Sequence, residues 1–339
     1  MSLTLLVIEK YSNMIDEKIF ARFPESSSAS LSEISFSLIE QQKKSWQMLA
    51  DGIAALENVQ VRDVHCNGFD VKLQFNPKRI ISSAAKTDTQ SIKERKCFLS
   101  VENLPAEQKG IFYKETFLIL CNPMPIFQQH FTISHKDHIP QTIEEYILSF
   151  LRLAKDFSPK FSVFYNGPKC GASAPDHMHF QASPTGKIPV EYDASDSLRR
   201  EFRKKIASVS ICTLNNFGRA VIILESTIEQ EMELVFLRTM SAMRKVMNTN
   251  EEPLVNVLGS YESGMWRIII FPRTKHRPDA YFKEGDEKIL VSPASVDIGG
   301  LVITPLEKDF HSLNALAIEN IFHEVTISDD MLNFIIEKI

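Results

Sequence analysis

Apolar positions recur along the chain with two distinct periods. Between residues 31 and 56 they fall close to every third or fourth position, with Glu, Gln and Lys between them, which predicts an amphipathic helix. Residues 59–75 instead alternate between apolar and polar side chains around Asn67-Gly68, which predicts a β-hairpin with a two-residue turn. Residues 80–95 show neither period, so we expect a loop there.

The remainder of the chain repeats one order of predicted elements. In each of two sets, apolar strands are followed by an amphipathic helix and two more strands. The predicted elements are strands 116–121 and 131–134, helix 142–155, strands 161–165 and 177–182, strand 220–224, helix 228–247, strands 254–258 and 265–271, and helices 307–324 and 329–338. The repeated order predicts an α+β fold that duplicates one unit, with antiparallel sheets and packed helices.

The length of 339 residues also favours more than one unit, because single hydrophobic cores seldom extend that far. We divide the chain into three parts. They are an N-terminal helix and hairpin at residues 1–75, a first repeat at 76–210, and a second repeat with the C-terminal helices at 211–339.

Composition narrows the class of partner. A net charge of -5 argues against broad nucleic-acid binding, which normally shows a basic excess. The apolar start at residues 1–8 is interrupted by Glu9 and Lys10, so neither a secretory signal nor a membrane span is expected. Five scattered cysteines indicate free thiols in a reducing compartment, which favours a cytoplasmic location. The sequence leaves the oligomeric state open, a homodimer included.

Polar chemistry gathers at residues 164–182, where an apolar strand ends, a loop of small residues follows and a second strand begins. The period of two places His177, His179 and Gln181 on one face of that second strand. Three polar side chains in a row cannot easily face an apolar core, because each would need a hydrogen-bond partner. A solvated strand face or a structural metal site is the plain alternative.

The loop before this strand suits a phosphate. Gly167 and Gly171 let backbone N–H groups approach an anion closely, and Ser173 adds a hydroxyl. The combination of this loop with paired histidines and a glutamine is far more specific than His-x-His alone. It favours a catalytic or ligand-binding interpretation.

These residues resemble the transferase branch of the histidine triad (HIT) superfamily, which includes galactose-1-phosphate uridylyltransferase, diadenosine tetraphosphate phosphorylase and the GDP-hexose phosphorylases. The resemblance implies a duplicated HIT-like fold in which His179 attacks an α-phosphate and forms a covalent nucleotidyl-histidine. It also implies that Asn166, Ser173 and Gln181 bind the phosphate. Hydrolases of the superfamily typically have a histidine where this chain has Gln181, so the resemblance favours transfer or phosphorolysis.

The chemistry is consistent with this role. A neutral imidazole has one free nitrogen, which can attack phosphorus if an acceptor holds the other nitrogen and so fixes the tautomer. The expected reaction takes a nucleoside monophosphate from a nucleotide sugar or a dinucleoside polyphosphate and passes it to inorganic phosphate or a sugar phosphate. Nucleotide hydrolysis and a catalytically decayed nucleotide sensor are the alternatives.

A metal site is expected to be incomplete. Cys97-Phe98-Leu99-Ser100 resembles the zinc-binding C-x-x-C segment of the uridylyltransferases, with Ser100 replacing the second cysteine. In that resemblance the remaining ligands would be Cys97, His138 and His177. A structural zinc site usually needs four ligands, so we predict no metal cofactor.

The second set of elements lacks His-x-His and is therefore not expected to form a second catalytic centre. A basic cluster follows its last strand and suits a phosphate or sugar phosphate; its members are Arg273, Lys275, His276 and Arg277. A solvated basic turn would have the same composition. Residues 292–300 resemble a segment of GDP-hexose phosphorylases. That resemblance favours a nucleotide sugar as the substrate.

Overall fold

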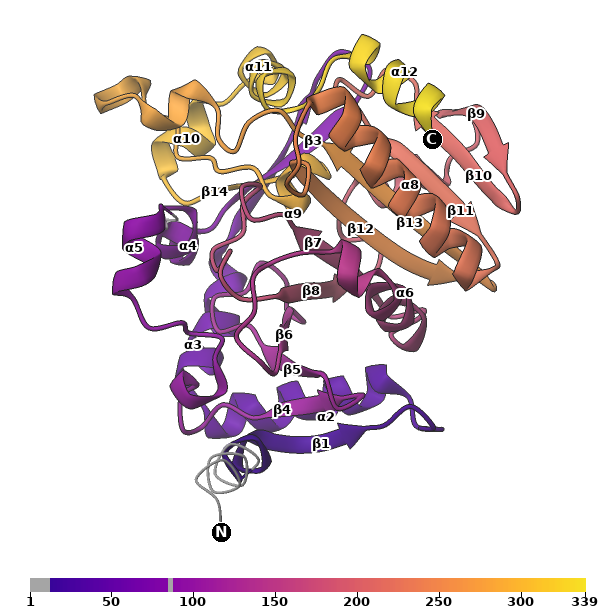
Figure 1. Ribbon diagram of the computed structural model, residues 1–339. Coiled ribbons are helices and arrows are strands. Elements are labelled where there is room, and N and C mark those ends of the chain that lie inside the picture. Colours follow the sequence, from indigo (N-terminus) through magenta and orange to yellow (C-terminus); the bar gives the residue numbers. More distant parts are fainter. Residues whose placement is uncertain (1–12, 85–87) are drawn as a thin grey trace.

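One eleven-stranded sheet extends through the computed structural model, which describes residues 13–84 and 88–339 (Figure 1). The apolar segment 1–8 therefore lies outside the described residues. In spatial order the strands are β1 (Ile19–Phe23), β4 (Gly110–Tyr113), β5 (Phe117–Cys121), β6 (Phe131–His135), β8 (His179–Pro184), β7 (Phe161–Asn166), β12 (Val255–Glu262), β13 (Met265–Pro272), β11 (Ile222–Ser226), β10 (Val209–Leu214) and β9 (Arg200–Ile206). All of the neighbouring pairs are antiparallel except β1 with β4.

The two halves of this sheet have the same topology. The first half has the order β4-β5-β6-β8-β7, with α6 (Ile147–Asp156) between β6 and β7 in the chain. The second half has the order β9-β10-β11-β13-β12, with α8 (Glu229–Met247) between β11 and β12. The halves meet where β7 pairs with β12. The predicted α+β fold with a duplicated unit is confirmed, whereas the residue boundaries of the three parts stay a prediction.

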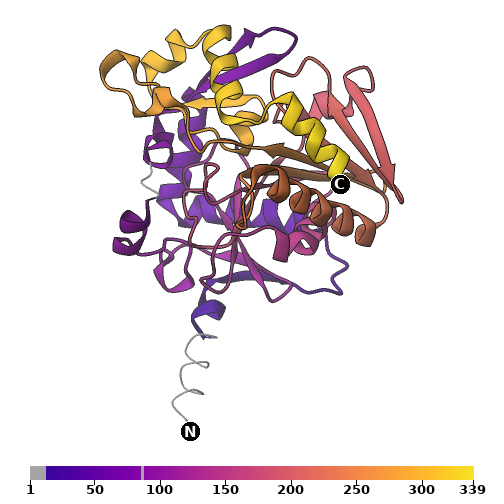
Figure 2. The same ribbon diagram turned by 45° about the horizontal axis from the view of Figure 1, so that its top comes forward.

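Helices cover one face of the sheet. The helices α2 (Leu31–Ser45), α6, α8 and α12 (Asp329–Lys338) pack their apolar side chains into one continuous core with this face. Figure 2 shows α8 and α12 side by side, in agreement with their packing contact. The amphipathic patterns found in the sequence therefore correspond to a single layer of helices.

The opposite face is covered in part by a smaller sheet, in which β3 (Asp70–Phe75) lies between β2 (Gln60–His65) and β14 (Leu301–Thr304). Strand β14 runs parallel to β3, so the predicted N-terminal hairpin is joined by a strand from the far end of the chain. The short helix α9 (Ser295–Ile298) and the longer α11 (Ala315–Val325) add to this second core. The face of the first half that this layer leaves uncovered contains the candidate site described below.

Several boundaries differ from the predicted ones. The predicted helix 31–56 is two helices, because Trp46 adopts an extended conformation (φ -132°, ψ 98°) before α3 (Gln47–Ala55) begins. The predicted loop 80–95 contains α4 (Ile80–Ser83) and α5 (Thr89–Glu94). Helix 307–324 is divided into α10 (Glu307–Ser312) and α11. Strands β1, β4, β9, β10 and β14 were not predicted; β9 is an edge strand whose many charges mask its alternation.

Arg273 follows β13 and is buried, which corrects its expected role in a phosphate-binding cluster. Its guanidinium donates five hydrogen bonds, all to protein acceptors. The acceptors are the carbonyl oxygens of Val325, Pro293, Lys275 and His276 and the side-chain oxygen of Asn256. Arg273 is only 1% exposed, so it joins β12, β13 and the C-terminal helices rather than presenting a charge to a ligand.

We predict that Arg273→Met lowers the free energy of unfolding by about 3–5 kcal/mol, because it leaves several buried acceptors without donors. Lys275→Met is the matched control from the same basic run. Lys275 is partly exposed and pairs with Asp279 and Glu324, so its loss should cost less than about 1 kcal/mol. Denaturant unfolding of both variants measures the difference. Equal, small losses would contradict the structural role of Arg273.

Candidate active site

Strand β8 directs His179 and Gln181 toward a cavity of about 600 Å³. Between them, Phe180 points to the other face and packs against Phe117 and Phe150 in the helical core. The alternation expected from the sequence is thus observed from His179 onward. His177 departs from it, because the strand begins only at His179.

The His179 imidazole is held in one tautomer. Its Nδ1 lies 2.8 Å from the carbonyl oxygen of His177, to which Nδ1–H donates. The lone pair is therefore on Nε2, the nitrogen that a nucleophile needs. Burial lowers the pKa of His179 to about 4, so the ring is neutral at physiological pH. His179 has the geometry and charge state of a nucleophilic histidine.

The Gln141 side chain forms hydrogen bonds with the backbone of His179. Its side-chain oxygen accepts from the His179 N–H at 2.7 Å, and its amide nitrogen donates to the carbonyl oxygens of His179 and Asn166, each at 3.0 Å. The same buried amide therefore holds the start of β8 and the end of β7 together. Gln141 was not predicted as a site residue, because a single glutamine between two predicted elements has no recognisable pattern.

His130 orients Gln181 in a similar way. The His130 Nδ1 accepts from the backbone N–H of Ile126 at 3.2 Å, which places the ring proton on Nε2. That Nε2–H donates to the Gln181 side-chain oxygen at 2.8 Å. The amide nitrogen of Gln181 is then the group left to donate to a ligand. Burial lowers the pKa of His130 to about 3, so it stays neutral and keeps this arrangement.

A smaller cavity of about 60 Å³ adjoins the first, and Arg79, Ser82, Ser173 and Gln181 line both. Of the residues predicted to bind phosphate, the small cavity is lined by Asn166, Gly171, Ser173, Gln181 and Arg277. Gly171 has a φ of +89°, and a Cβ there would lie 2.6 Å from the Cβ of Ala294. Glycine is therefore required for the loop to pack closely at this point.

Other predicted ligands lie elsewhere. Gly167 donates its N–H to Val255 O and lines a separate cavity of about 630 Å³ on the other side of the loop. Lys275 is engaged with two carboxylates, as described above. His276 lines neither of the cavities beside His179, and burial lowers its pKa to about 4. The structure thus brings Arg277 to the site and directs Gly167, Arg273, Lys275 and His276 away from it.

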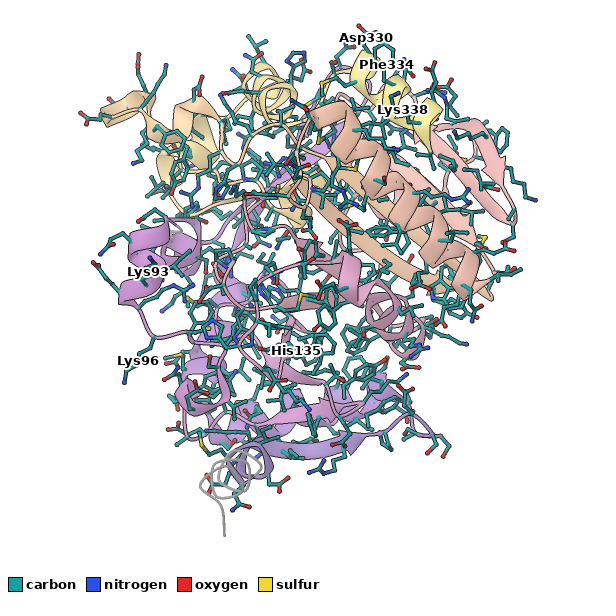
Figure 3. All side chains as sticks on the ribbon, viewed as in Figure 1. Lys93, Lys96, His135, Asp330, Phe334 and Lys338 are labelled. Carbon is teal, nitrogen blue, oxygen red and sulfur yellow. The ribbon has the colours of Figure 1, made fainter. Side chains whose placement is uncertain are left out.

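Arg95 links the segment after α5 to the loop of residues 167–178, which precedes His179. Its guanidinium donates to the Asp176 carboxylate at 2.6 Å and to Ser173 O at 3.4 Å, and it lines the large cavity. Lys93 and Lys96, which flank Arg95 in the sequence, are exposed and lie at the outer edge of the molecule (Figure 3). Neither Arg95 nor Arg79 was predicted as a site residue, because both belong to a segment without a readable period.

Three possible metal ligands lie close together: Cys97, His138 and His177, the last of which belongs to the loop before β8. Their donor atoms lie within 4.8 Å of one another, and Cys97 Sγ is 3.3 Å from His177 Nδ1. Tetrahedral zinc would need donor separations of roughly 3.3–3.6 Å, so the three are close to metal-binding distances. The His177 Nε2–H donates to the backbone of His135, which lies among the strands of the first half (Figure 3). Ser100 Oγ is buried without a hydrogen-bond partner among the described residues.

In the second half, Arg267 occupies the position that His179 has in the first. His179 pairs in register with Ser134, the fourth residue of β6, and Arg267 pairs with Glu225, the fourth residue of β11. The Arg267 guanidinium also forms an ion pair with the Glu225 carboxylate at 2.7 Å. An arginine paired with a carboxylate offers no neutral nitrogen at this position; that the second half has no catalytic centre stays a prediction.

Comparison with protein families finds two matches along the chain. Residues 38–184 match a domain of unknown function (DUF4922), and residues 189–339 match the GDPGP1-like, C-terminal domain. A search of curated protein sequences finds no significant match. Within the described residues, no helix combines the length and apolar character that crossing a membrane requires.

Solved structures of the yeast Ap4A phosphorylase Apa2 have a similar fold. The complex with AMP aligns with a TM-score of 0.56 and 14% sequence identity, and covers 86% of this chain and 96% of that one. A second structure, of Apa2 with no ligand named, aligns with a TM-score of 0.52 and 16% sequence identity, and covers 83% of this chain and 94% of that one. The chain therefore shares its fold with these Ap4A phosphorylase structures, and its residues 189–339 match the GDPGP1-like, C-terminal domain, in line with the expected resemblance.

Proposed function

We propose that the protein is a nucleotidyltransferase of the phosphorylase type, which passes a nucleoside monophosphate through His179 to a phosphate acceptor. The observation that carries this proposal is the His179 imidazole. It is neutral, its tautomer is fixed by His177 O, and it faces a cavity beside the Gln181 amide. The shared fold with an Ap4A phosphorylase supports it.

The large cavity suits a nucleoside. Three of its lining side chains, Met48, Ile81 and Phe98, are 56%, 67% and 48% exposed, so an apolar wall faces the opening. A flat nucleobase would cover these apolar side chains, while Asn122 and Thr132, which also line the cavity, offer hydrogen bonds. A nucleoside monophosphate placed in this way would bring its phosphate to Gln181 and Ser173.

We favour a nucleotide sugar, of the GDP-hexose kind, as the substrate. Residues 292–300, which resemble a segment of GDP-hexose phosphorylases, supply Ser292, Ala294 and Asp297 to the small polar cavity. A dinucleoside polyphosphate is the second candidate, because a yeast Ap4A phosphorylase with a similar fold has been solved in complex with Ap4A. Added phosphate should be required for nucleoside diphosphate release from either substrate.

The reaction proceeds in two displacements. His179 Nε2 attacks the α-phosphorus, the bond from phosphorus to the leaving oxygen breaks, and the sugar phosphate departs with the bonding electrons. An oxygen of the acceptor phosphate then attacks the same phosphorus, the P–N bond breaks, and a nucleoside diphosphate is released. Between the steps the His179 ring is cationic, and its Nδ1–H remains bonded to His177 O. Gln181 and Ser173 are placed to donate to the non-bridging oxygens.

Hydrolysis and nucleotide sensing are the rival functions. A sensor would bind nucleotide without forming a covalent adduct, and a hydrolase would release nucleoside monophosphate without needing phosphate. Incubating the protein with an α-labelled nucleotide sugar or dinucleotide and quenching in alkali distinguishes the proposed enzyme from a sensor, because only the enzyme retains the label covalently. Product analysis with and without phosphate distinguishes a phosphorylase from a hydrolase.

We predict that His179→Ala abolishes the covalent adduct and lowers turnover at least about a thousandfold, as for other nucleophile deletions. No neighbouring group is placed to supply the attacking nitrogen. His65→Ala is the matched control, because His65 is exposed on β2 and remote from the cavity lining. Retention of the label is measured after denaturation. Label that persists in His179→Ala would disprove the assignment.

We predict that Gln181→His shifts the acceptor from phosphate toward water. The Gln181 amide donates without exchanging protons near neutral pH, whereas a histidine there could shuttle a proton to or from water. The ratio of nucleoside monophosphate to nucleoside diphosphate should rise at equal substrate and phosphate concentrations, with products separated by chromatography. An unchanged ratio with intact activity would place acceptor choice elsewhere.

We predict that the purified protein lacks stoichiometric zinc. Cys97, His138 and His177 offer three donors, and the hydroxyl of Ser100 is a poor zinc ligand. Ser100→Cys should restore a fourth ligand and with it one zinc per chain, measured by elemental analysis after dialysis. Stoichiometric zinc in the natural protein that is lost in Cys97→Ala would show that three ligands suffice.

A further inference from the structure

Three arginines line the two adjoining cavities, and their charges are compensated differently. Arg95 forms an ion pair with Asp176, and Arg277 donates to Ser292 Oγ at 3.0 Å and stacks on the ring of Tyr281. Arg79 forms no ion pair with any residue in the described ranges 13–84 and 88–339. It is therefore a cation beside His179 that forms no ion pair with a carboxylate among the described residues.

The Arg79 side chain is held firmly despite this. It ends a 3₁₀ turn, and its Nη1 donates to Met124 O at 2.7 Å. Its Nε is buried and has no hydrogen-bond partner among the described residues. The nearby carboxylate of Asp297 instead accepts from the backbone N–H groups of Ala294 and Ile303, at 2.9 Å each. One buried donor of a fixed guanidinium is thus left unused.

An uncompensated cation in such a place is costly. Burial lowers the pKa of Arg79 to about 10, with the Asp297 charge opposing the shift, so the guanidinium remains charged at neutral pH. Burying a charge and leaving a donor unsatisfied both raise the free energy of the folded state. An anion bound in the cavity would compensate the buried charge.

The small cavity has the size and lining for one phosphate group. Its volume of about 60 Å³ has room for a group the size of a few water molecules, which excludes a nucleoside. Arg79, Arg277 and Ser173 line it, and Gln181 lines both this cavity and the large one, which His179 also lines. A phosphate held there would lie next to a nucleotidyl group on His179.

We propose that Arg79 and the small cavity bind the acceptor phosphate, and in the first displacement the phosphate of the departing sugar phosphate. This assignment rests on the proposed function. Both ligands present the same chemistry, a phosphate dianion, and both must lie opposite His179 Nε2 across the α-phosphorus, in line with the bond that forms or breaks. Arg79 then favours phosphate over water as the acceptor by binding it.

The test compares the natural protein with Arg79→Met, Arg79→Lys and Lys78→Met, the last removing an exposed neighbouring cation. Thermal unfolding is recorded with and without inorganic phosphate, with chloride matching the ionic strength. Phosphate should stabilise the natural protein and Lys78→Met, stabilise Arg79→Lys less, and leave Arg79→Met unaffected. The KM for phosphate should rise about ten- to hundredfold in Arg79→Met, as expected for a lost charge-assisted hydrogen bond.

The unfolding temperature without phosphate distinguishes a phosphate-binding role of Arg79 from a merely structural one. Because the unneutralised cation is costly, Arg79→Met without phosphate should unfold at the same temperature as the natural protein or higher. A lower unfolding temperature together with an unchanged phosphate response would overturn the proposal, as would the absence of any phosphate effect on the natural protein. If no covalent adduct forms but phosphate stabilisation still depends on Arg79, the proposed function fails and the phosphate site stands.

Discussion

The pairing of β7 with β12 is the constraint on which the candidate site depends. It joins the two halves of the sheet, and a buried polar network continues from it into the catalytic loop. Asn256 donates to the Asn166 side-chain oxygen at 3.0 Å and accepts from Arg273, which in turn reaches the carbonyl of Pro293. Ser295 donates to the same Asn166 oxygen at 2.8 Å. Since every member is satisfied by another, the loop before His179 is held by the second half of the chain, and neither half could form the site alone.

Within that frame, hydrogen bonds decide what each catalytic group can do. The carbonyl of His177 and burial together leave His179 with an unprotonated Nε2, so in the proposed reaction no separate general base would be needed. His130 performs the corresponding task for Gln181, because its single proton fixes which end of the amide faces the ligand. Both histidines stay neutral, and the cationic character of the site comes from arginines instead. The structure thus places a neutral histidine, an oriented amide and arginine side chains together at the adjoining cavities.

Local patterns predicted the parts of the site that depend on local geometry. The period of two was sufficient to place His179 and Gln181 on one face, and the turn chemistry of Gly171 was readable because a close approach needs glycine. Contacts across the chain were not readable. Gln141 reaches His179 over 38 residues, and Arg79 faces the cavity from a segment without a period. Arg273 shows the reverse error: a basic run suggested a ligand-binding charge, but tertiary packing buried that one residue among carbonyl groups.

The duplicated sheet also explains why the residues at the equivalent row of the second half do not line a cavity like the one beside His179. In the first half, Thr132 and Gln181 pair in register and line the large cavity. The equivalent pair in the second half is Ile223 with Ile269, and both are buried in the core beneath the smaller sheet. Replacing a polar pair by an apolar pair removes the hydrogen-bonding groups and lets the covering layer pack directly on the strands. At the end of the same row, Glu225 pairs with Arg267, so this position of the second half holds an ion pair and not a neutral imidazole. The strand edge of the second half instead holds the first half's loop in place through the pairing of β12 with β7.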